Sequence, residues 1–96
     1  MHRYLSVHFT VHGRVQGVFF RAYTRDKATS LGLVGYCRNT PEGTVQGVIQ
    51  GVQESVESMK QWLRTEGSPH SSITHCDFAL EEPMTSLDYS TFDVRR

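Results

Sequence analysis

Hydrophobic patterning along this 96-residue chain predicts an α+β fold, in which two helices pack on one face of an antiparallel sheet. Three observations carry the prediction. Apolar and polar residues alternate near the N-terminus with the period of a half-buried strand. Two later segments repeat their apolar residues at helical spacing, and the segments between and after them are typical of strands. Since a chain of this length can bury one core, we expect residues 1–96 to form a single domain.

The first predicted elements are a strand, a helix and a second strand. The alternation covers residues 5–14 and predicts the first strand. A helix is predicted over residues 20–31, and Gly32 is its C-terminal stop. Residues 34–39 form the second predicted strand. A short glycine-containing loop therefore connects the first strand to the first helix.

A hairpin and a second helix follow. The turn Thr40-Pro41-Glu42-Gly43 leads into a third strand at residues 44–50, because proline presets φ and glycine can take a positive φ. The second helix has an apolar stripe at helical spacing, and Gly67-Ser68-Pro69 ends it. The stripe consists of Val52, Val56, Met59 and Leu63.

Two further strands are predicted after the second helix. They cover residues 73–80 and 87–94, on either side of a break at Glu81-Glu82-Pro83. The complete order is βαββαβ plus a C-terminal strand, which is the ferredoxin-like two-layer α/β sandwich with both helices on one face of an antiparallel sheet. This fold serves many functions, so the function must be inferred from particular residues.

Composition excludes several classes of function. Ten basic and ten acidic side chains cancel to a net charge of zero, which argues against nucleic-acid and membrane partners. The start of the chain lacks the apolar core of a signal peptide, and no run of about 18 apolar residues occurs. Two cysteines, Cys37 and Cys76, do not make a disulfide framework and are expected to be buried thiols. We therefore expect a cytoplasmic monomer.

The loop between the first strand and the first helix predicts an anion-binding site. The first N–H groups of a helix have no internal partner, and the helix dipole adds positive charge there. Successive loop N–H groups can surround a phosphate, while an arginine can bind two of its oxygens. All these features occur together in one segment, Gly13-Arg14-Val15-Gln16-Gly17-Val18-Phe19-Phe20-Arg21.

This segment, with a second one downstream, resembles the acylphosphatase family. The family's signature Gly-Arg-Val-Gln-Gly-Val-x-Phe-Arg is complete from Gly13 to Arg21. The second signature, Gly-Trp-Val-x-Asn-x-x-x-Gly-x-Val, is matched over residues 35–45, with Tyr36 for tryptophan and Cys37 for valine. The likeness extends over nearly the whole chain and is closest to the small free-standing animal-type enzymes. It implies metal-free, cofactor-free hydrolysis of small acyl phosphates to a carboxylate and inorganic phosphate.

The resemblance assigns catalytic roles to Arg21 and Asn39. The Arg21 guanidinium is suited to the charge that spreads over the equatorial oxygens during phosphoryl transfer. Backbone N–H groups in the preceding loop are expected to bind the phosphate as well. Asn39 can orient the attacking water but is too weak a base to deprotonate it, and the family proposal gives that proton to the substrate phosphate. Inorganic phosphate should bind as product and inhibitor. The expected phosphate-binding residues are Gln16, Gly17, Val18, Phe19, Phe20 and Arg21.

Two other functions remain open on sequence grounds. A non-catalytic ferredoxin-like module would bind an anion or a nucleotide for regulation and would not turn it over. An RNA-recognition domain shares the element order, but Phe19 and Phe20 lie in a loop and not on a central strand.

The histidines do not predict a metal site. His8 and His12 share a strand face but lie roughly 13 Å apart, too far to bind one ion. His70 and His75 have no ligand spacing with a cysteine pair.

The C-terminus supplies a last hypothesis. In some relatives, the terminal carboxylate pairs with the catalytic arginine. This chain ends in Arg95 and Arg96, and the hypothesis is that its terminal carboxylate contacts Arg21.

Overall fold

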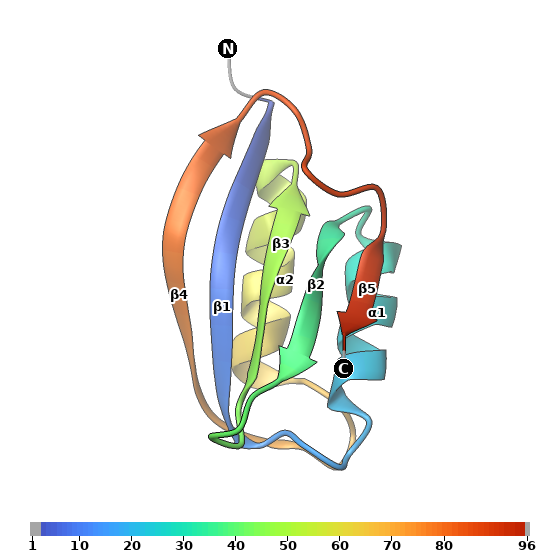
Figure 1. Ribbon diagram of the computed structural model, residues 1–96, viewed down its shortest axis with the longest axis vertical. Helices are drawn as coiled ribbons and strands as arrows, with labels where there is room; N and C mark the ends of the chain where they lie inside the picture. The colour runs from blue at the N-terminus through green and yellow to red at the C-terminus, as the bar shows by residue number, and fades with distance from the viewer. Residues whose placement is uncertain (1–2, 96) are drawn as a thin grey trace.

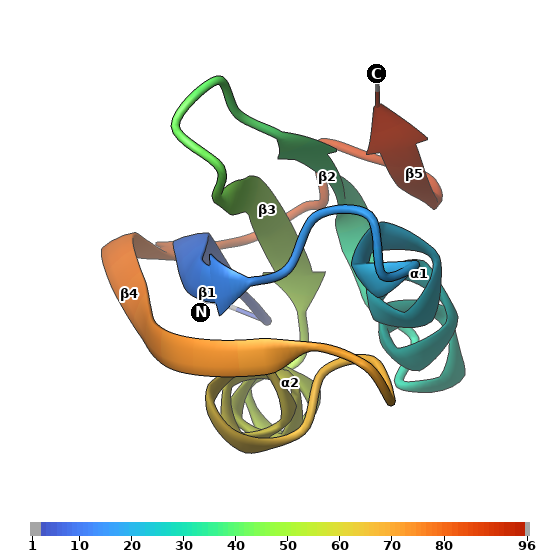
Figure 2. The same cartoon turned by 90° about the horizontal axis from the view of Figure 1, so that it is seen from below.

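Five strands form one sheet, and two helices cover one of its faces, in the computed structural model, which describes residues 3–95 (Figures 1 and 2). The strand order is β4-β1-β3-β2-β5, so β4 and β5 are the edges. This arrangement confirms the predicted ferredoxin-like α+β fold. In chain order the elements are β1 (Tyr4–Arg14), α1 (Phe20–Ser30), β2 (Val34–Asn39), β3 (Val45–Gly51), α2 (Gln53–Thr65), β4 (Ser72–Met84) and β5 (Phe92–Arg95).

The sheet is mixed and not wholly antiparallel as expected. Four of the strands pair antiparallel, whereas β5 pairs parallel with β2, from Gly35 opposite Phe92 to Arg38 opposite Arg95. After β4 the chain crosses the end of the sheet and turns back along the opposite edge (Figure 1). Because β4 and β2 run in opposite directions, a chain that turns back in this way enters β5 in the direction of β2.

The predicted break at Glu81-Glu82-Pro83 is not a break. Strand β4 continues to Met84, and its pairing with β1 reaches Tyr4. The chain accommodates this stretch by a register shift opposite Val7 and by a left-handed residue, Leu80, with φ of 52°. Pro83 is tolerated because β4 is an edge strand and needs N–H donors on one side only. The last strand is correspondingly shorter and begins at Phe92.

The core lies between the sheet and the two helices. Helix α2 buries three of the four predicted stripe positions, Val56, Met59 and Leu63, and α1 buries Phe20 and Ala28. The fourth, Val52, was predicted wrongly, because it is the N-cap of α2 and its side chain is half exposed. Opposite them, β1 contributes alternate residues, Val7, Phe9 and Val11. Burying each such side chain contributes about 1.5–3 kcal/mol to folding, so both helices are held firmly on the sheet.

Both cysteines are free thiols, and only Cys37 is as deeply buried as expected. Its side chain is fully buried in the core, whereas Cys76 is half-buried. Over residues 3–95, neither helix has the length and apolarity that crossing a membrane requires.

Candidate active site

The loop between β1 and α1, together with the first residues of the helix, forms the cradle (residues 15–21). Two left-handed residues shape it, Gly17 with φ of 73° and Phe19 with φ of 59°. Glycine adopts this conformation freely, whereas for phenylalanine it costs about 1–2 kcal/mol. Left-handed residues that alternate with others turn successive N–H groups toward one side, which creates a concave anion-binding surface. Strain at Phe19 is typical of a functional loop.

The N-terminus of α1 retains its partial positive charge. Phe19 is the N-cap, and no side chain caps the helix there. The first turn contains no acidic residue, and the basic side chain of Arg21 lies within it. The first N–H groups and the helix dipole are therefore available to an anion.

Gln16 fastens the cradle to the β2–β3 turn. Its side-chain Nε2 donates hydrogen bonds to the carbonyl oxygens of Thr40 and Thr44, both at 2.9 Å. These bonds occupy the donor end of the side chain. Only the backbone N–H of Gln16 therefore remains for phosphate, and its side chain serves as a brace.

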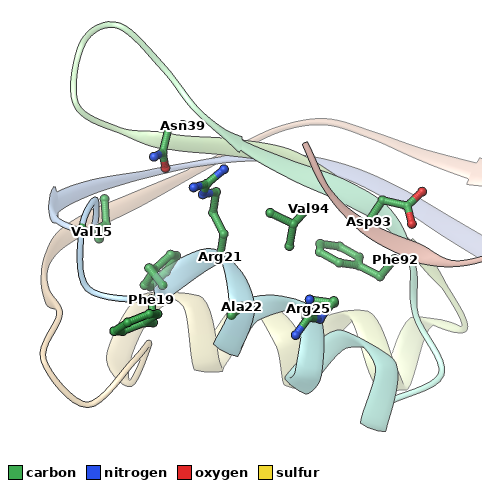
Figure 3. Close-up of a pocket in the computed structure, with 11 residues that line it drawn as sticks. Val15, Phe19, Arg21, Ala22, Arg25, Asn39, Phe92, Asp93 and Val94 are labelled. Carbon is green, nitrogen blue, oxygen red and sulfur yellow. The ribbon is translucent and has the colours of Figure 1, made fainter. Parts of the chain in front are cut away.

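Arg21 and Asn39, which are 18 positions apart in the sequence, come together in space. Figure 3 shows the Arg21 guanidinium extending from α1 toward the amide of Asn39 at the end of β2. The Arg21 Nη1 donates to the carbonyl of Arg95 at 2.9 Å, which holds the side chain across the gap to β5. The Asn39 Oδ1 is buried and has no hydrogen-bond partner among residues 3–95. Because no described protein group occupies this buried acceptor, it can accept a hydrogen bond from a ligand or a water.

These residues line a cleft of about 710 Å³. Of the predicted phosphate-binding residues, Gly17, Phe19, Phe20 and Arg21 line it. Gln16 and Val18 do not, because the Gln16 side chain binds the hairpin turn and the Val18 side chain is buried in the core.

Sequence reasoning missed five residues of this cleft, namely Ala22, Arg25, Phe92, Asp93 and Val94. Arg25 follows Arg21 by four positions on α1, and this helical spacing was a signal that could have found it. Phe92 and Val94 belong to β5, whose position next to β2 the sequence did not reveal. The cleft therefore combines the cationic side chains of Arg21 and Arg25 from α1 with the apolar side chains of Phe92 and Val94 from β5, and the acidic residue Asp93 also lines it.

Cys37 lies beneath the site but is not a nucleophile. Its Sγ is 3.9 Å from the carbonyl oxygen of Arg21. Burial raises the pKa of the Cys37 thiol to about 12, and this outweighs the lowering effect of Arg21 and Arg25. Since the thiolate is the reactive form, a thiol with this pKa is inert at neutral pH.

The hypothesis about the terminal carboxylate concerns Arg96, which lies outside the described residues. The contact that the structure describes is made by the backbone carbonyl of Arg95.

Comparison with known proteins identifies the family of this chain. The model of the acylphosphatase family matches residues 7–94. The chain is 48% identical over 92 residues to acylphosphatase-1 of Gallus gallus, covering 96% of this chain and 93% of the relative. It is 50% identical over 90 residues to acylphosphatase-2 of Bos taurus, covering 94% of this chain and 91% of that protein.

A solved structure agrees with these relatives. The acylphosphatase of Coxiella burnetii superposes with a TM-score of 0.85 at 38% identity, covering 97% of this chain and 94% of that one. The sequence relatives and the structural likeness span almost the full length of both partners. The chain therefore belongs to the acylphosphatase family of enzymes.

Proposed function

We propose that this chain hydrolyses small acyl phosphates, with the phosphoryl group bound in the cradle by Arg21 and by backbone N–H groups of residues 16–21. Asn39 positions the attacking water. The observation that carries the proposal is the buried Oδ1 of Asn39, which no other group of residues 3–95 hydrogen-bonds, in the same cleft as the Arg21 guanidinium.

Charge complementarity supports the binding step. An acyl phosphate dianion meets the guanidinium of Arg21, the N-terminus of α1 and the more distant charge of Arg25. These groups are fixed before the substrate arrives, because Arg21 is held by Arg95 and the loop is braced by Gln16. Preorganised donors stabilise the charge that spreads over the phosphoryl oxygens in the transition state.

The hydrolytic step needs a correctly placed water and little else. The Asn39 Oδ1 accepts a hydrogen bond from the water, whose oxygen attacks phosphorus opposite the leaving carboxylate. The phosphorus–oxygen bond to the acyl group breaks, and its electron pair leaves on the carboxylate. One proton of the water passes to a phosphate oxygen, so an acyl phosphate dianion and water give a carboxylate and dihydrogen phosphate.

No general acid or covalent intermediate is required. A carboxylate is a stable leaving group and departs without protonation. Because the buried Cys37 thiol stays protonated, it does not compete with water for phosphorus. The product phosphate retains the charge that the cradle recognises, so inorganic phosphate should compete with substrate.

The test is hydrolysis of benzoyl phosphate in excess EDTA by the wild type and two variants. We expect rapid wild-type turnover, a loss of at least about 10³-fold in kcat/KM for Arg21→Ala, and a loss of about 10²-fold in kcat for Asn39→Ala. Arg38→Ala is the matched control, because Arg38 precedes Asn39 in the sequence but its side chain hydrogen-bonds Gln46 on the exposed surface. Its kcat/KM should stay within about twofold of the wild type.

Other outcomes would contradict the proposal. Turnover that EDTA abolishes would exclude the metal-free mechanism. Wild-type turnover no faster than spontaneous hydrolysis would exclude the enzyme, and phosphate binding without turnover would then favour the regulatory module. Equal losses for Arg38→Ala and Arg21→Ala would refute the assigned role of Arg21.

A further inference from the structure

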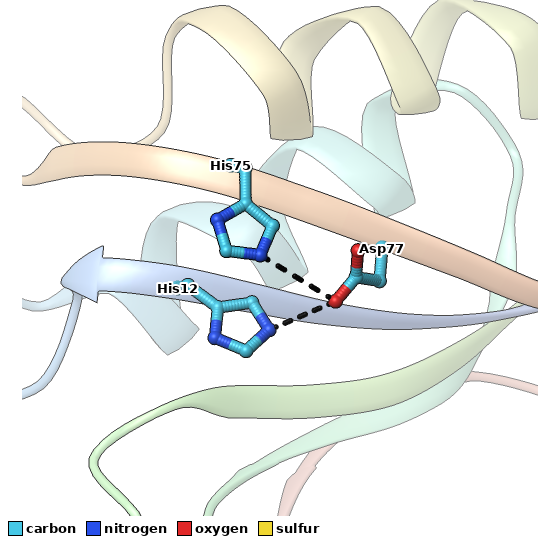
Figure 4. Close-up of side chains that lie close together, drawn as sticks. All are labelled: His12, His75 and Asp77. Atoms are coloured by element: carbon cyan, nitrogen blue, oxygen red, sulfur yellow. Dashed lines mark hydrogen bonds and ion pairs between the residues drawn. The ribbon is translucent and has the colours of Figure 1, made fainter.

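Two histidines and an aspartate converge on the sheet face that the helices leave open. The Nε2 of His12 lies 3.0 Å from the Oδ2 of Asp77, and the Nε2 of His75 lies 3.6 Å from the same oxygen (Figure 4). The two imidazole rings stack, with centroids 4.1 Å apart and planes inclined by 10°. Within residues 3–95, this is the one group of three histidine, cysteine or acidic residues whose ligand atoms lie within 4.8 Å of one another.

Cross-strand pairing brings the three residues together. His12 of β1 is directly opposite His75 of β4, and Asp77 lies two residues further along β4 on the same face. Their sequence neighbours Val11 and Cys76 contact the core, so the three polar side chains point away from the helices. A register shift follows immediately after His12, and such bulges re-aim neighbouring side chains.

The donor set fits a borderline divalent transition metal. Neutral imidazole nitrogen and carboxylate oxygen are common ligands of Zn²⁺, at about 2.0–2.2 Å. When two ligand atoms bind one ion at this bond length and at the tetrahedral angle, they lie about 3.3–3.4 Å from each other. The two distances to Asp77 Oδ2 are 3.0 and 3.6 Å, one on either side of that value. The ligand atoms are thus already near the spacing that an ion needs.

Small side-chain rotations complete the site. Stacked rings point their nitrogens in similar directions, so each ring must turn for both Nε2 atoms to face one ion. The His75 and Asp77 side chains are 55% and 65% exposed, and these rotations therefore meet little resistance. The His12 Nε2 is within hydrogen-bond distance of the Asp77 Oδ2, whereas the His75 Nε2 is slightly too far away for a hydrogen bond. To bind the ion, each imidazole carries its proton on Nδ1 and presents the Nε2 lone pair to the metal.

We propose that His12, His75 and Asp77 form a binding site for Zn²⁺ or a similar transition-metal ion, with water as the remaining ligand. The ion joins β1 to the edge strand β4 and stabilises that pairing. The site is distinct from the cradle, because Arg21 and Asn39 lie on the helix-covered side of the sheet, where Cys37 contacts α1. The proposed metal therefore stabilises the fold and takes no part in hydrolysis.

Cys76 does not offer a competing thiolate. It lies between His75 and Asp77 in the sequence but faces the core. The ion therefore has the two imidazoles and the carboxylate as its protein ligands on this face.

Calorimetric titration of the full, tag-free chain with ZnCl₂ tests the proposal, in buffer free of phosphate and after removal of bound metal. We expect one Zn²⁺ per chain and a rise in Tm of several degrees when the ion is in large excess. His75→Gln and Asp77→Asn should each weaken Zn²⁺ binding by at least about tenfold. Mg²⁺ at the same concentration should not bind, since it prefers oxygen ligands.

His8→Gln and His70→Gln are the matched controls, because both histidines are exposed and outside the cluster. Each should bind Zn²⁺ as the wild type does. Absence of Zn²⁺ binding would overturn the proposal, as would an equal loss of affinity in the cluster variants and the controls. Since the titration contains no substrate, its result is independent of whether the chain hydrolyses acyl phosphates. Benzoyl phosphate hydrolysis by His75→Gln at wild-type rate would show that the variant is folded.

Discussion

The two helices of this protein begin in opposite ways, although neither is capped by a side chain. The second residue of α1 is Arg21, whereas the second residue of α2 is Glu54. The N-cap of α1, Phe19, is left-handed, and the N-cap of α2, Val52, is extended. In α2 the carboxylate of Glu54 interacts favourably with the positive end of the helix dipole. In α1 no acidic side chain of the first turn does so, and the positive end is available to an anionic ligand. An uncapped helix start is therefore not enough for anion binding, which also requires a shaped loop and no internal anion.

The largest expected effect comes from placing an acidic residue in the first turn of α1, which would make the start of α1 resemble that of α2. Ala22 lines the cleft, so the Ala22→Glu carboxylate is added beside the cradle. If it extends into the cleft, its separation from a bound phosphate is on the order of 5 Å. Repulsion at this distance is about 3 kcal/mol at an effective dielectric of about 20, so kcat/KM should fall about 100-fold. The free energy of unfolding should stay unchanged or rise slightly, because the acid favours the helix dipole. Ala22→Gln is the neutral control, and an equal loss in both variants would refute the electrostatic explanation.

Removing the brace should have the next largest effect. Gln16→Ala leaves the carbonyls of Thr40 and Thr44 without this donor, in a part-buried position. The free energy of unfolding should fall by about 1–3 kcal/mol, and KM should rise because the cradle is less well ordered. Urea denaturation and steady-state kinetics measure the two effects. Gln46→Ala, which removes an exposed hydrogen bond to Arg38, should cost less than about 0.5 kcal/mol, and a similar cost for both variants would contradict the bracing role.

The left-handed loop residue should contribute a smaller, purely conformational effect. A Cβ at Gly17 would meet no atom within 4 Å, so Gly17→Ala introduces backbone strain without a clash. Its φ of 73° predicts a destabilisation of about 1–2 kcal/mol. At the other helix start, Val52→Ala should change stability by less than about 0.5 kcal/mol, since Val52 is extended and half exposed. Thermal unfolding of both variants distinguishes these cases; equal shifts in Tm would argue against strain at Gly17.

The buried thiol of Cys37 should change the free energy of unfolding only in alkaline solution. Below its ordinary pKa of 9.0, Cys37 carries a proton in both the folded and the unfolded chain, and stability does not depend on it. Between pH 9 and the folded pKa of about 12, the unfolded state loses the proton first, so the free energy of unfolding falls as pH rises. Relative to Cys37→Val, the wild type should lose up to about 1.4 kcal/mol per pH unit in this range. Parallel stability curves for the two proteins above pH 9 would show that the thiol is not buried as described.

The order of the elements and the candidate site were predictable because their signals are local. The cradle is one continuous segment, and Asn39 was proposed because the segment around it resembles the second signature of the acylphosphatase family. Their convergence follows once the strand order is known, since β2 and α1 are adjacent in the fold.

The features that the sequence did not predict depend on pairing across the sheet. His12 and His75 are 63 positions apart, and only the register of β1 with β4 makes them neighbours. Pro83 suggested a break because the sequence does not show that β4 is an edge strand. The parallel pairing of β5 likewise depends on the path that the chain takes across the sheet end.

The hydrogen bond from Arg21 to the Arg95 carbonyl has a consequence for the timing of folding. The two residues are 74 positions apart. Arg21 is therefore synthesised long before β5, the strand whose carbonyl holds its guanidinium in place. On a ribosome, the cradle can emerge and pack well before β5 is available to hold the guanidinium. Loop closure over such a separation is slow relative to local helix formation. Turnover by nascent chains would therefore begin only after β5 has paired with β2, which makes enzymatic activity a direct reporter of the final docking step.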